Sequence, residues 1–245
     1  MKKLSVLLAF LLALSSVLQV SASESHENDV EYEAQVAAIM VSYVADPEAA
    51  NKALEAIDTE LLCEPTIVEY GNSNQRKTSP SDYELTVSVF KRSNSDRYYL
   101  QWILLANTNE WFEGPLDYVS LEWDTAYASY YLSSAGGDGC TVQGRDAGIV
   151  LFNVEDDKMS SGDYVYGTVQ VEPLQTGWME FGSKYVHTYT SLFVSGSASY
   201  SYVTSASASA VGAGLGLSYT KTYTVNVSTD TNQWQIWADN AVNIY

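Results

Sequence analysis

Short runs of alternating apolar and polar residues fill the chain from Pro65 onward, and they predict β-strands. The clearest run is YELTVSVF at residues 83–90, whose apolar phase consists of Tyr83, Leu85, Val87 and Val89. Successive side chains of a strand point to opposite faces, so this run predicts a half-buried strand. The run YYLQWILLA at 98–106 is almost continuously apolar, which predicts a central strand covered on both faces.

Similar runs recur, separated by clusters of Gly, Asn, Ser and Asp that favour turns. They cover residues 66–70, 83–90, 98–106, 118–124, 127–133, 148–154 and 164–172. About ten strands in roughly 180 residues favour one all-β domain, an antiparallel β-sandwich, over two domains. We assign this sandwich to residues 63–245.

The segment before the strands has helical periodicity instead. Within residues 28–60, apolar residues are three and four positions apart at Val36, Ile39, Met40, Tyr43 and Val44, as on one face of a helix. Asp46 followed by Pro47 predicts the N-cap and first residue of a second helix. We therefore predict two short helices in an N-terminal segment, 23–62, that packs on the edge of the sandwich or serves as a pro-segment.

The first residues have the features of a secretory signal peptide. Two lysines precede an apolar run from Leu4 to Leu14, and a short exit ends at Ala22. The run is shorter than the ~20 residues that a membrane-spanning helix needs, which disfavours the alternative of an anchor. We predict that the signal peptide, 1–22, is removed and that the protein is secreted to the extracellular space.

The stretch from Ser191 to Thr229 contains a single charged residue, Lys221, and alternates with period two. Serine occupies nearly every odd position of 195–209, whereas the odd positions of 211–227 are mostly apolar. This phase change predicts a turn or bulge near 210–214, and hence a long C-terminal hairpin rich in Ser and Thr. The alternatives are a flexible linker and a hairpin that inserts into membranes to form a pore.

The charge of the chain excludes one class of partner. There are 12 basic and 30 acidic residues, which give a net charge of −18. Such a surface repels nucleic acid and anionic lipid headgroups, so we exclude a nucleic-acid partner. Basic partners, or Ca²⁺ held by the excess carboxylates, remain compatible with it.

Two cysteines, Cys63 and Cys140, are predicted to form one disulfide, because an even number of cysteines in an exported chain favours pairing. Two free thiols are the alternative. A metal site that combines cysteine and histidine is disfavoured, since His26 and His187 have no ligand-like spacing to either cysteine.

No catalytic motif stands out, and we predict that the protein is not an enzyme. His187 shares a strand face with Tyr185 and Tyr189, a setting more typical of a structural histidine than of a catalytic triad. Among the many carboxylates, Glu122 and Asp124 are the first that a search for a glycosidase pair would inspect.

Acidic loops give no defined metal motif. Asp156, Asp157 and Asp163 gather near Gly162, and Asp138 lies in a glycine-rich turn, but neither group has the spacing of an EF-hand. We predict solvated loops and no resident metal or cofactor, with Ca²⁺ as the alternative.

Aromatic residues are the remaining candidates for ligand binding. Trp111, Phe112 and Trp178 lie in loop-like sequence and are the rings that we select. Flat rings exposed at a surface stack on sugars, which makes a glycan or another cell-surface component a candidate partner. The alternative is that these rings fill the core.

Three sequence elements carry a resemblance to a known group of proteins. GPLDYVSLEWD, GIVLFNVEDD, and YVHTYTS with the alternating serine-rich segment resemble small exported proteins of unassigned function from Gram-positive bacteria and archaea. The resemblance covers roughly residues 83–230. It implies a secreted β-rich fold and brings no activity or site residues.

These features together predict a secreted, non-catalytic β-sandwich protein that acts in extracellular binding or surface interaction. A membrane-active protein that inserts its 191–229 hairpin is the second hypothesis. An extracellular hydrolase is the third.

Overall fold

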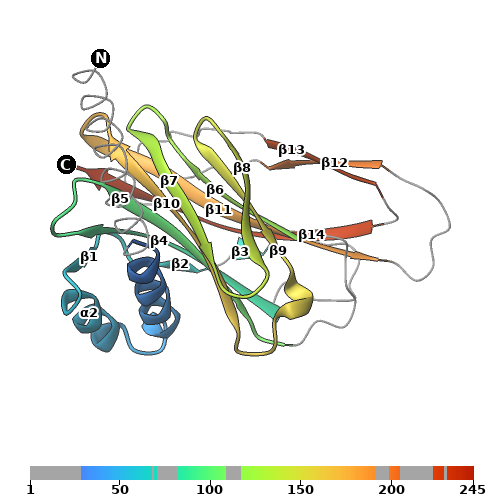
Figure 1. The fold of residues 1–245 in the computed structure, drawn as a ribbon, viewed down its shortest axis with the longest axis horizontal. Helices are drawn as coiled ribbons and strands as arrows, with labels where there is room; N and C mark the ends of the chain where they lie inside the picture. Colours follow the sequence, from blue (N-terminus) through green and yellow to red (C-terminus); the bar gives the residue numbers. More distant parts are fainter. Residues whose placement is uncertain are drawn as a thin grey trace, which may run out of the picture. The chain divides into compact units, whose positions relative to one another are not determined.

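The structure, a computed structural model, describes residues 29–67, 69–70, 82–108, 117–190, 199–204, 223–228 and 231–245 (Figure 1). The chain divides into two compact units, 1–38 and 39–245. The described part of the first unit is helical, and the second unit opens with helical residues as far as position 43. The predicted signal peptide lies outside the described residues.

The predicted second helix is confirmed as α2, Pro47–Glu55. Asp46 is its N-cap, and its carboxylate accepts a hydrogen bond from the backbone N–H of Ala49 at 3.0 Å. Pro47 begins the helix, where its missing N–H leaves no bond unmade. Within the described ranges, no helix is long and apolar enough to cross a bilayer.

Most of the second unit is β-structure in two antiparallel sheets, which confirms the prediction of an all-β fold. The first sheet has the order β1-β4-β5-β10-β7, with β2 paired to β4. Its strands are β1 (Thr59–Leu61), β2 (Thr66–Ile67), β4 (Tyr83–Arg92), β5 (Tyr98–Ala106), β7 (Ala128–Gly136) and β10 (Tyr164–Pro173).

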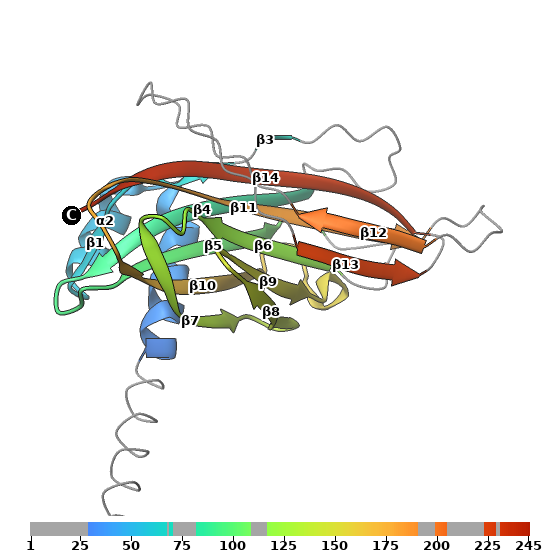
Figure 2. The same cartoon turned by 90° about the horizontal axis from the view of Figure 1, so that it is seen from above.

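The second sheet has the order β3-β14-β11-β6-β9-β8. Its strands are β3 (Glu69–Tyr70), β6 (Asp117–Trp123), β8 (Cys140–Asp146), β9 (Ile149–Val154), β11 (Gly177–Thr190) and β14 (Thr231–Ile244). Figure 2 shows β14 running beside β11, with which it pairs over 14 residues from Gly177↔Ile244 to Thr190↔Thr231.

The hydrophobic cluster of the second unit takes side chains from both sheets. Trp102 of β5 and Phe152 of β9 meet edge to face, with ring centroids 5.2 Å apart and an interplanar angle of 72°. A Cβ atom at Gly167 would lie 2.4 Å from Trp102 Nε1. Only glycine therefore lets β10 pass this close to the indole.

Period-two alternation locates β4 and β5 correctly. The core-facing residues Tyr83, Leu85 and Val87 are buried, and the polar residues between them are half-buried. β5 lies between β4 and β10 and is buried at all but one of its residues, as its continuous apolar run predicts.

The predicted disulfide between Cys63 and Cys140 is wrong, because both residues are free thiols. Cys63 lies beside β4, hydrogen-bonded to the backbone of Val89, whereas the Cys140 thiol lies 3.6 Å from the carbonyl oxygen of Tyr166 in β10. β5 separates β4 from β10, and neighbouring strands are ~4.8 Å apart. The sulfurs therefore cannot approach to the ~2.05 Å of a disulfide.

Burial keeps both thiols protonated. It raises the pKa of Cys63 to about 11, against the hydrogen bond from the Val89 backbone, and that of Cys140 to about 12. Thiolate is the reactive form of cysteine, so neither residue is set up for redox chemistry or metal binding.

Candidate metal centre

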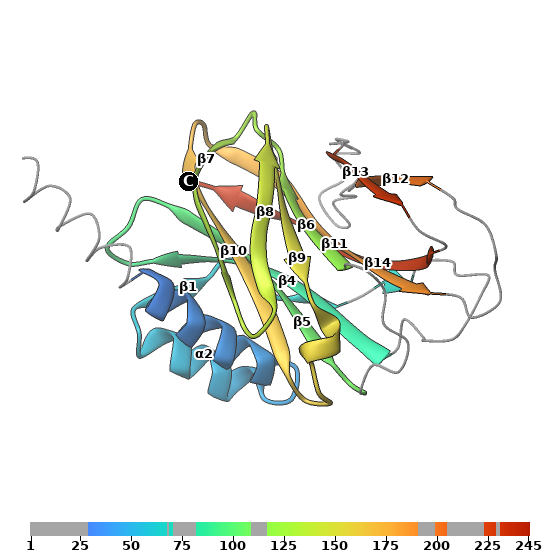
Figure 3. The same ribbon diagram turned by 45° about the vertical axis from the view of Figure 1, so that its right-hand side comes forward.

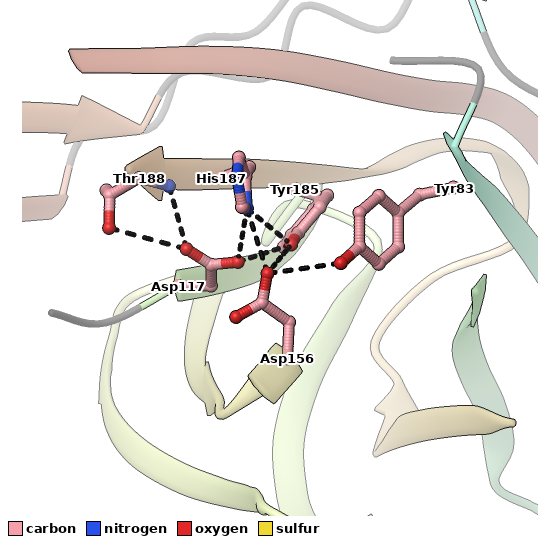
Figure 4. Close-up of polar contacts among 6 residues, drawn as sticks. All are labelled: Tyr83, Asp117, Asp156, Tyr185, His187 and Thr188. Atoms are coloured by element: carbon pink, nitrogen blue, oxygen red, sulfur yellow. Dashed lines mark hydrogen bonds and ion pairs between the residues drawn. The ribbon is translucent and has the colours of Figure 1, made fainter. Parts of the chain in front are cut away.

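Six side chains from four elements meet where β4 and β6 begin (Figure 4). Tyr83 and Asp117 are the first residues of β4 and β6, and Asp156 is the first residue of a short 3₁₀ helix, η2 (Asp156–Lys158). The other three, Tyr185, His187 and Thr188, lie on β11.

Strand register brings these residues together. β6 and β11 pair antiparallel with Tyr118 opposite Val186, so the start of β6 lies beside His187 and Thr188. Tyr185 and His187 are two residues apart and therefore share one face of β11.

Asp156 reaches the same place through the partner strand of β6. β9 pairs with β6 so that Val154 lies opposite Asp117. The chain then turns into η2, which returns Asp156 to the beginning of β6 (Figure 4).

Four ligand-type atoms lie close together at the centre of this cluster. His187 Nδ1 lies 2.9 Å from Asp117 Oδ2 and 2.9 Å from Asp156 Oδ2. The Tyr185 hydroxyl donates to Asp117 Oδ2, and it lies 3.4 Å from Asp156 Oδ2 and 3.3 Å from His187 Nδ1. The atoms that meet are two carboxylate oxygens, one imidazole nitrogen and one phenol oxygen.

The outer contacts hold both carboxylates in place. The second oxygen of Asp117, Oδ1, accepts a hydrogen bond from the Thr188 backbone N–H at 2.7 Å, which leaves Oδ2 directed at the histidine. The Tyr83 hydroxyl donates to Asp156 Oδ2 at 3.1 Å. Tyr83 belongs to the first sheet and Asp117 to the second, so the cluster bridges the two.

The cluster is buried, and burial shapes its protonation. Burial alone would lower the pKa of His187, but the charges and hydrogen bonds of Asp117 and Asp156 outweigh it and raise the pKa to about 10. Burial and the charge of Asp117 raise the pKa of Asp156 to about 6, against the opposing contact with His187. Burial, then the two carboxylates, raise the pKa of Tyr185 well above its ordinary value.

The charges do not balance within the cluster. Two carboxyl groups meet one histidine, so the fully ionised cluster carries one excess negative charge where Asp117 and His187 are at most 1% exposed. An unbalanced buried charge is costly. Two arrangements suit the geometry: a proton shared among the three groups, or a cation bound by them.

The distances fit a cation. Asp117, Asp156 and His187 offer ligand atoms that all lie within 4.8 Å of one another. Two donors bound to one cation at about 2.1 Å lie about 3.0 Å apart in an octahedral site and about 3.4 Å apart in a tetrahedral one. Both oxygen–nitrogen pairs are 2.9 Å apart, nearer the octahedral spacing.

The sequence predicted no metal site: it favoured a structural role for His187 and a solvated loop for Asp156, Asp157 and Asp163. Asp156 is buried in the cluster instead. Asp157 and Asp163 are exposed outside it, and Asp163 accepts a hydrogen bond from the Ser160 N–H at 2.8 Å. Asp117 and Tyr83 were missed as ligands. Parity was the available signal for Asp117, which has the phase of the buried residues Val119, Leu121 and Trp123.

The other selected carboxylates lie elsewhere. Glu122 is five residues from Asp117 on β6 and therefore faces the opposite side of the second sheet, where it accepts a hydrogen bond from the Ser120 hydroxyl at 3.0 Å. Asp124 follows β6, and its N–H donates to the Glu180 carbonyl. Asp138 is exposed in the turn before β8.

Of the selected aromatic residues, Trp178 is the one that the structure describes, and it stands apart from the cluster. Trp178 is the second residue of β11, lies opposite Asn243 and is 45% exposed. Trp111 and Phe112 lie outside the described residues, so a role for them in ligand binding stays a prediction.

The C-terminal hairpin is described only in part. β12 (Ser199–Thr204) and β13 (Tyr223–Ser228) pair antiparallel, with Ser199 opposite Ser228. The predicted turn at 210–214 lies outside the described residues. Membrane insertion by 191–229 therefore stays a prediction.

Comparison with known proteins assigns no family. No family model matches the chain, and no curated protein matches its sequence. The resemblance to small exported proteins thus stays a prediction, and function has to be argued from the cluster itself.

Proposed function

We propose that the protein binds a divalent transition-metal cation through Asp117, Asp156 and His187. The observation that carries this proposal is the 2.9 Å separation of His187 Nδ1 from one oxygen of each carboxylate. The three residues come from β6, η2 and β11, and their arrangement depends on the whole fold. Within the broader prediction, the protein is a secreted binding protein without catalytic activity.

Charge supports a cation over a shared proton. Replacing the proton of His187 by a divalent cation changes the net charge of the three groups from minus one to zero. A neutral buried centre avoids the cost of an unbalanced charge in a low-dielectric interior. The phenol of Tyr185, 3.3 Å from His187 Nδ1, is positioned as a fourth donor.

The donor set favours a first-row transition metal over Ca²⁺. Calcium takes six to eight oxygen ligands, whereas imidazole nitrogen suits Zn²⁺ and its neighbours in the series. Carboxylate oxygens also accept Mn²⁺. We therefore expect binding in the order Zn²⁺ over Mn²⁺ over Ca²⁺.

We further propose that the two sheets pack face to face as a β-sandwich, closed at one end by the metal centre. The shared hydrophobic cluster and the contact between Trp102 and Phe152 support this packing. A bound cation would tie Asp117 and His187 of the second sheet to Asp156, which the Tyr83 hydroxyl links to the first. Its expected role is to stabilise the fold or the partner-binding form.

Metal binding can be tested by comparing variants of two neighbouring carboxylates, Asp156 and Asp157. Protein purified without added metal is treated with chelator, and its metal content and melting temperature are measured before and after addition of Zn²⁺, Mn²⁺ or Ca²⁺. We expect one Zn²⁺ per chain and a rise in melting temperature, since a ligand that binds only the folded state stabilises it. Asp156→Asn should abolish both effects.

Asp157→Asn is the matched control, because Asp157 is exposed and adjacent in sequence. It should bind Zn²⁺ like the unmodified chain. No Zn²⁺ uptake by the unmodified protein, or equal uptake by both variants, would contradict the proposal and leave the shared proton as the explanation of the cluster.

A further inference from the structure

Two adjacent tyrosines of β7 make the same contact with two arginines. The guanidinium carbon of Arg97 lies 3.4 Å from the ring centroid of Tyr131, and that of Arg145 lies 4.1 Å from the ring centroid of Tyr130. The pairing of β7 with β10 is irregular at Tyr131, so burial shows where the rings lie. Tyr130 packs against the hydrophobic core, whereas Tyr131 is 43% exposed.

The two arginines differ in their acidic partners. Arg97 lies 3.9 Å from a carboxylate oxygen of Glu172 and donates to Gln170 Oε1 at 3.3 Å. Arg145 forms no ion pair with any residue in the described ranges. This is unusual in a chain with 30 acidic and 12 basic residues.

A cavity of about 430 Å³ opens beside Arg145. It lies between the end of β6, the beginning of β7 and the β8–β9 turn. β7 and β8 are the edge strands of their sheets, and Figure 3 shows them on the same side of the molecule. The volume is in the range of small-molecule sites.

The walls of this cavity are mainly apolar. Trp123, Ala128, Tyr130 and Ala147 contribute to them. The Trp123 indole N–H already donates to the Ala128 carbonyl at 3.0 Å, and its ring stacks on Tyr130 with centroids 6.5 Å apart. The indole therefore offers the cavity an apolar surface rather than a free donor.

We infer that this cavity binds a small monocarboxylate with a flat apolar body. Its carboxylate pairs with Arg145, and its body fills the space against Trp123 and Tyr130. Guanidinium matches a carboxylate with two parallel hydrogen bonds. This site is independent of the metal centre, which lies at the other end of β6.

Asp146 selects against ligands with a second negative charge. Its carboxylate lines the same cavity and accepts a hydrogen bond from the Ala147 N–H at 2.7 Å. A second anionic group on the ligand would be repelled there. Uncharged hydroxyl groups would not be repelled. Two kinds of ligand with one carboxylate therefore fit: an aromatic carboxylate, or a sugar acid.

The apolar walls favour the aromatic acid, and binding measurements distinguish the two. Benzoate, benzamide and glucuronate are titrated into the full protein by calorimetry, and the Trp123 indole N–H is followed by NMR. We expect benzoate to bind at least about tenfold more tightly than benzamide, which has the same shape without the charge. Benzoate should also shift the Trp123 signal.

Two arginine variants locate the charge that is recognised. Arg145→Gln should weaken benzoate binding at least about tenfold, whereas Arg97→Gln, the matched control from the other Arg–Tyr pair, should leave it unchanged. Circular dichroism checks that both variants fold, and Arg145→Lys serves if Arg145→Gln does not. Lysine keeps the charge but loses the bidentate contact, so it should bind benzoate more weakly.

Several outcomes would overturn the inference. Equal affinity for benzoate and benzamide would mean that no guanidinium recognises the charge of the ligand. An equal loss of benzoate affinity in the two arginine variants would mean that Arg145 is not the residue that recognises it. Binding of glucuronate without benzoate would contradict the apolar body. An unchanged Trp123 signal at saturating benzoate would place the ligand elsewhere.

Discussion

Buried charged groups occupy both faces of the second sheet, and their balance differs. On the face away from the cluster, Glu122 of β6 is fully buried and Lys184 of β11 is 7% exposed; burial lowers the pKa of Lys184, and the charge of Glu122 opposes that shift. Within this pair one acid meets one base, and a second buried acid of the same face, Glu180, is considered below. On the core face, two acids, Asp117 and Asp156, meet one histidine.

The comparison indicates which of the two groups carries a charge that the chain itself does not compensate. An acid and a base buried together compensate each other once both are in place. Two acids and one base do not. A cation at the core-face cluster and none at the outer pair is thus the arrangement that charge alone favours, and substitutions on the two faces should behave differently.

The largest effect is expected for Asp117→Asn in metal-free protein. Asp117 accepts hydrogen bonds from Thr188 N–H and Tyr185 and lies against His187, and an amide cannot accept at both of its polar atoms. Breaking a buried charged network costs about 3–5 kcal/mol, which urea unfolding in chelator would measure. Asp163→Asn, at an exposed carboxylate, is the control; a loss for Asp117→Asn no larger than for this control would contradict the network.

Removal of the base on the outer face should cost less. Lys184→Met leaves Glu122 buried without its opposite charge, and we expect a loss of about 2 kcal/mol because Lys184 keeps some contact with water. The double variant with Glu122→Gln should recover most of that loss. Lys158→Met, at an exposed lysine paired with Glu155 at 2.6 Å, should leave stability unchanged, and a double variant no better than Lys184→Met would contradict mutual compensation.

Strand positions could be predicted where a strand has one wet and one dry face. β4 comes nearest to this condition over its first five residues, where buried and half-buried residues alternate; β6 alternates in sequence although all seven of its residues are buried. β8 does not: it is an edge strand, exposed at most of its residues, so burial imposes no apolar period on it. Its sequence, CTVQGRD, therefore gives no strand signal.

The cluster could not be predicted in the same way, because it depends on pairing between distant segments. Asp117 and Thr188 are 71 positions apart and are joined only through the β6–β11 register. Parity placed His187 with Tyr185 and could have placed Asp117 on the core face. No local pattern indicates that these faces meet. The disulfide was predicted wrongly for the same reason, because the sequence does not show which strands pair.

A smaller, pH-dependent effect is expected at Glu180 on β11, on the outer face. Burial raises its pKa, and the charges of Asp124 and Asp239 raise it further. A raised pKa means that the protonated form suits the folded state, so the stabilising contribution is present below the unfolded pKa and is lost as pH rises through the folded pKa.

Glu180→Gln should therefore be more stable than the unmodified chain at pH 7 and equal to it near pH 4. Melting temperatures across this range test the sign. Glu172→Gln, at an exposed carboxylate, should show no such crossover. A gain for Glu180→Gln that is constant with pH would mean that charge is not its cause.

The smallest change in metal-free stability is expected for Asp156→Asn. This prediction tests the excess negative charge that distinguishes the core face from the outer face. The amide oxygen can still accept from the Tyr83 hydroxyl, which lies 3.1 Å from Asp156 Oδ2, and the substitution removes the excess negative charge. These effects oppose each other, so the free energy of unfolding in chelator should differ by less than about 1 kcal/mol from that of the unmodified chain. Addition of Zn²⁺ should then stabilise the unmodified chain alone. If Asp156→Asn instead loses as much metal-free stability as Asp117→Asn, the second carboxylate is part of a balanced network and the core face has no need of a cation.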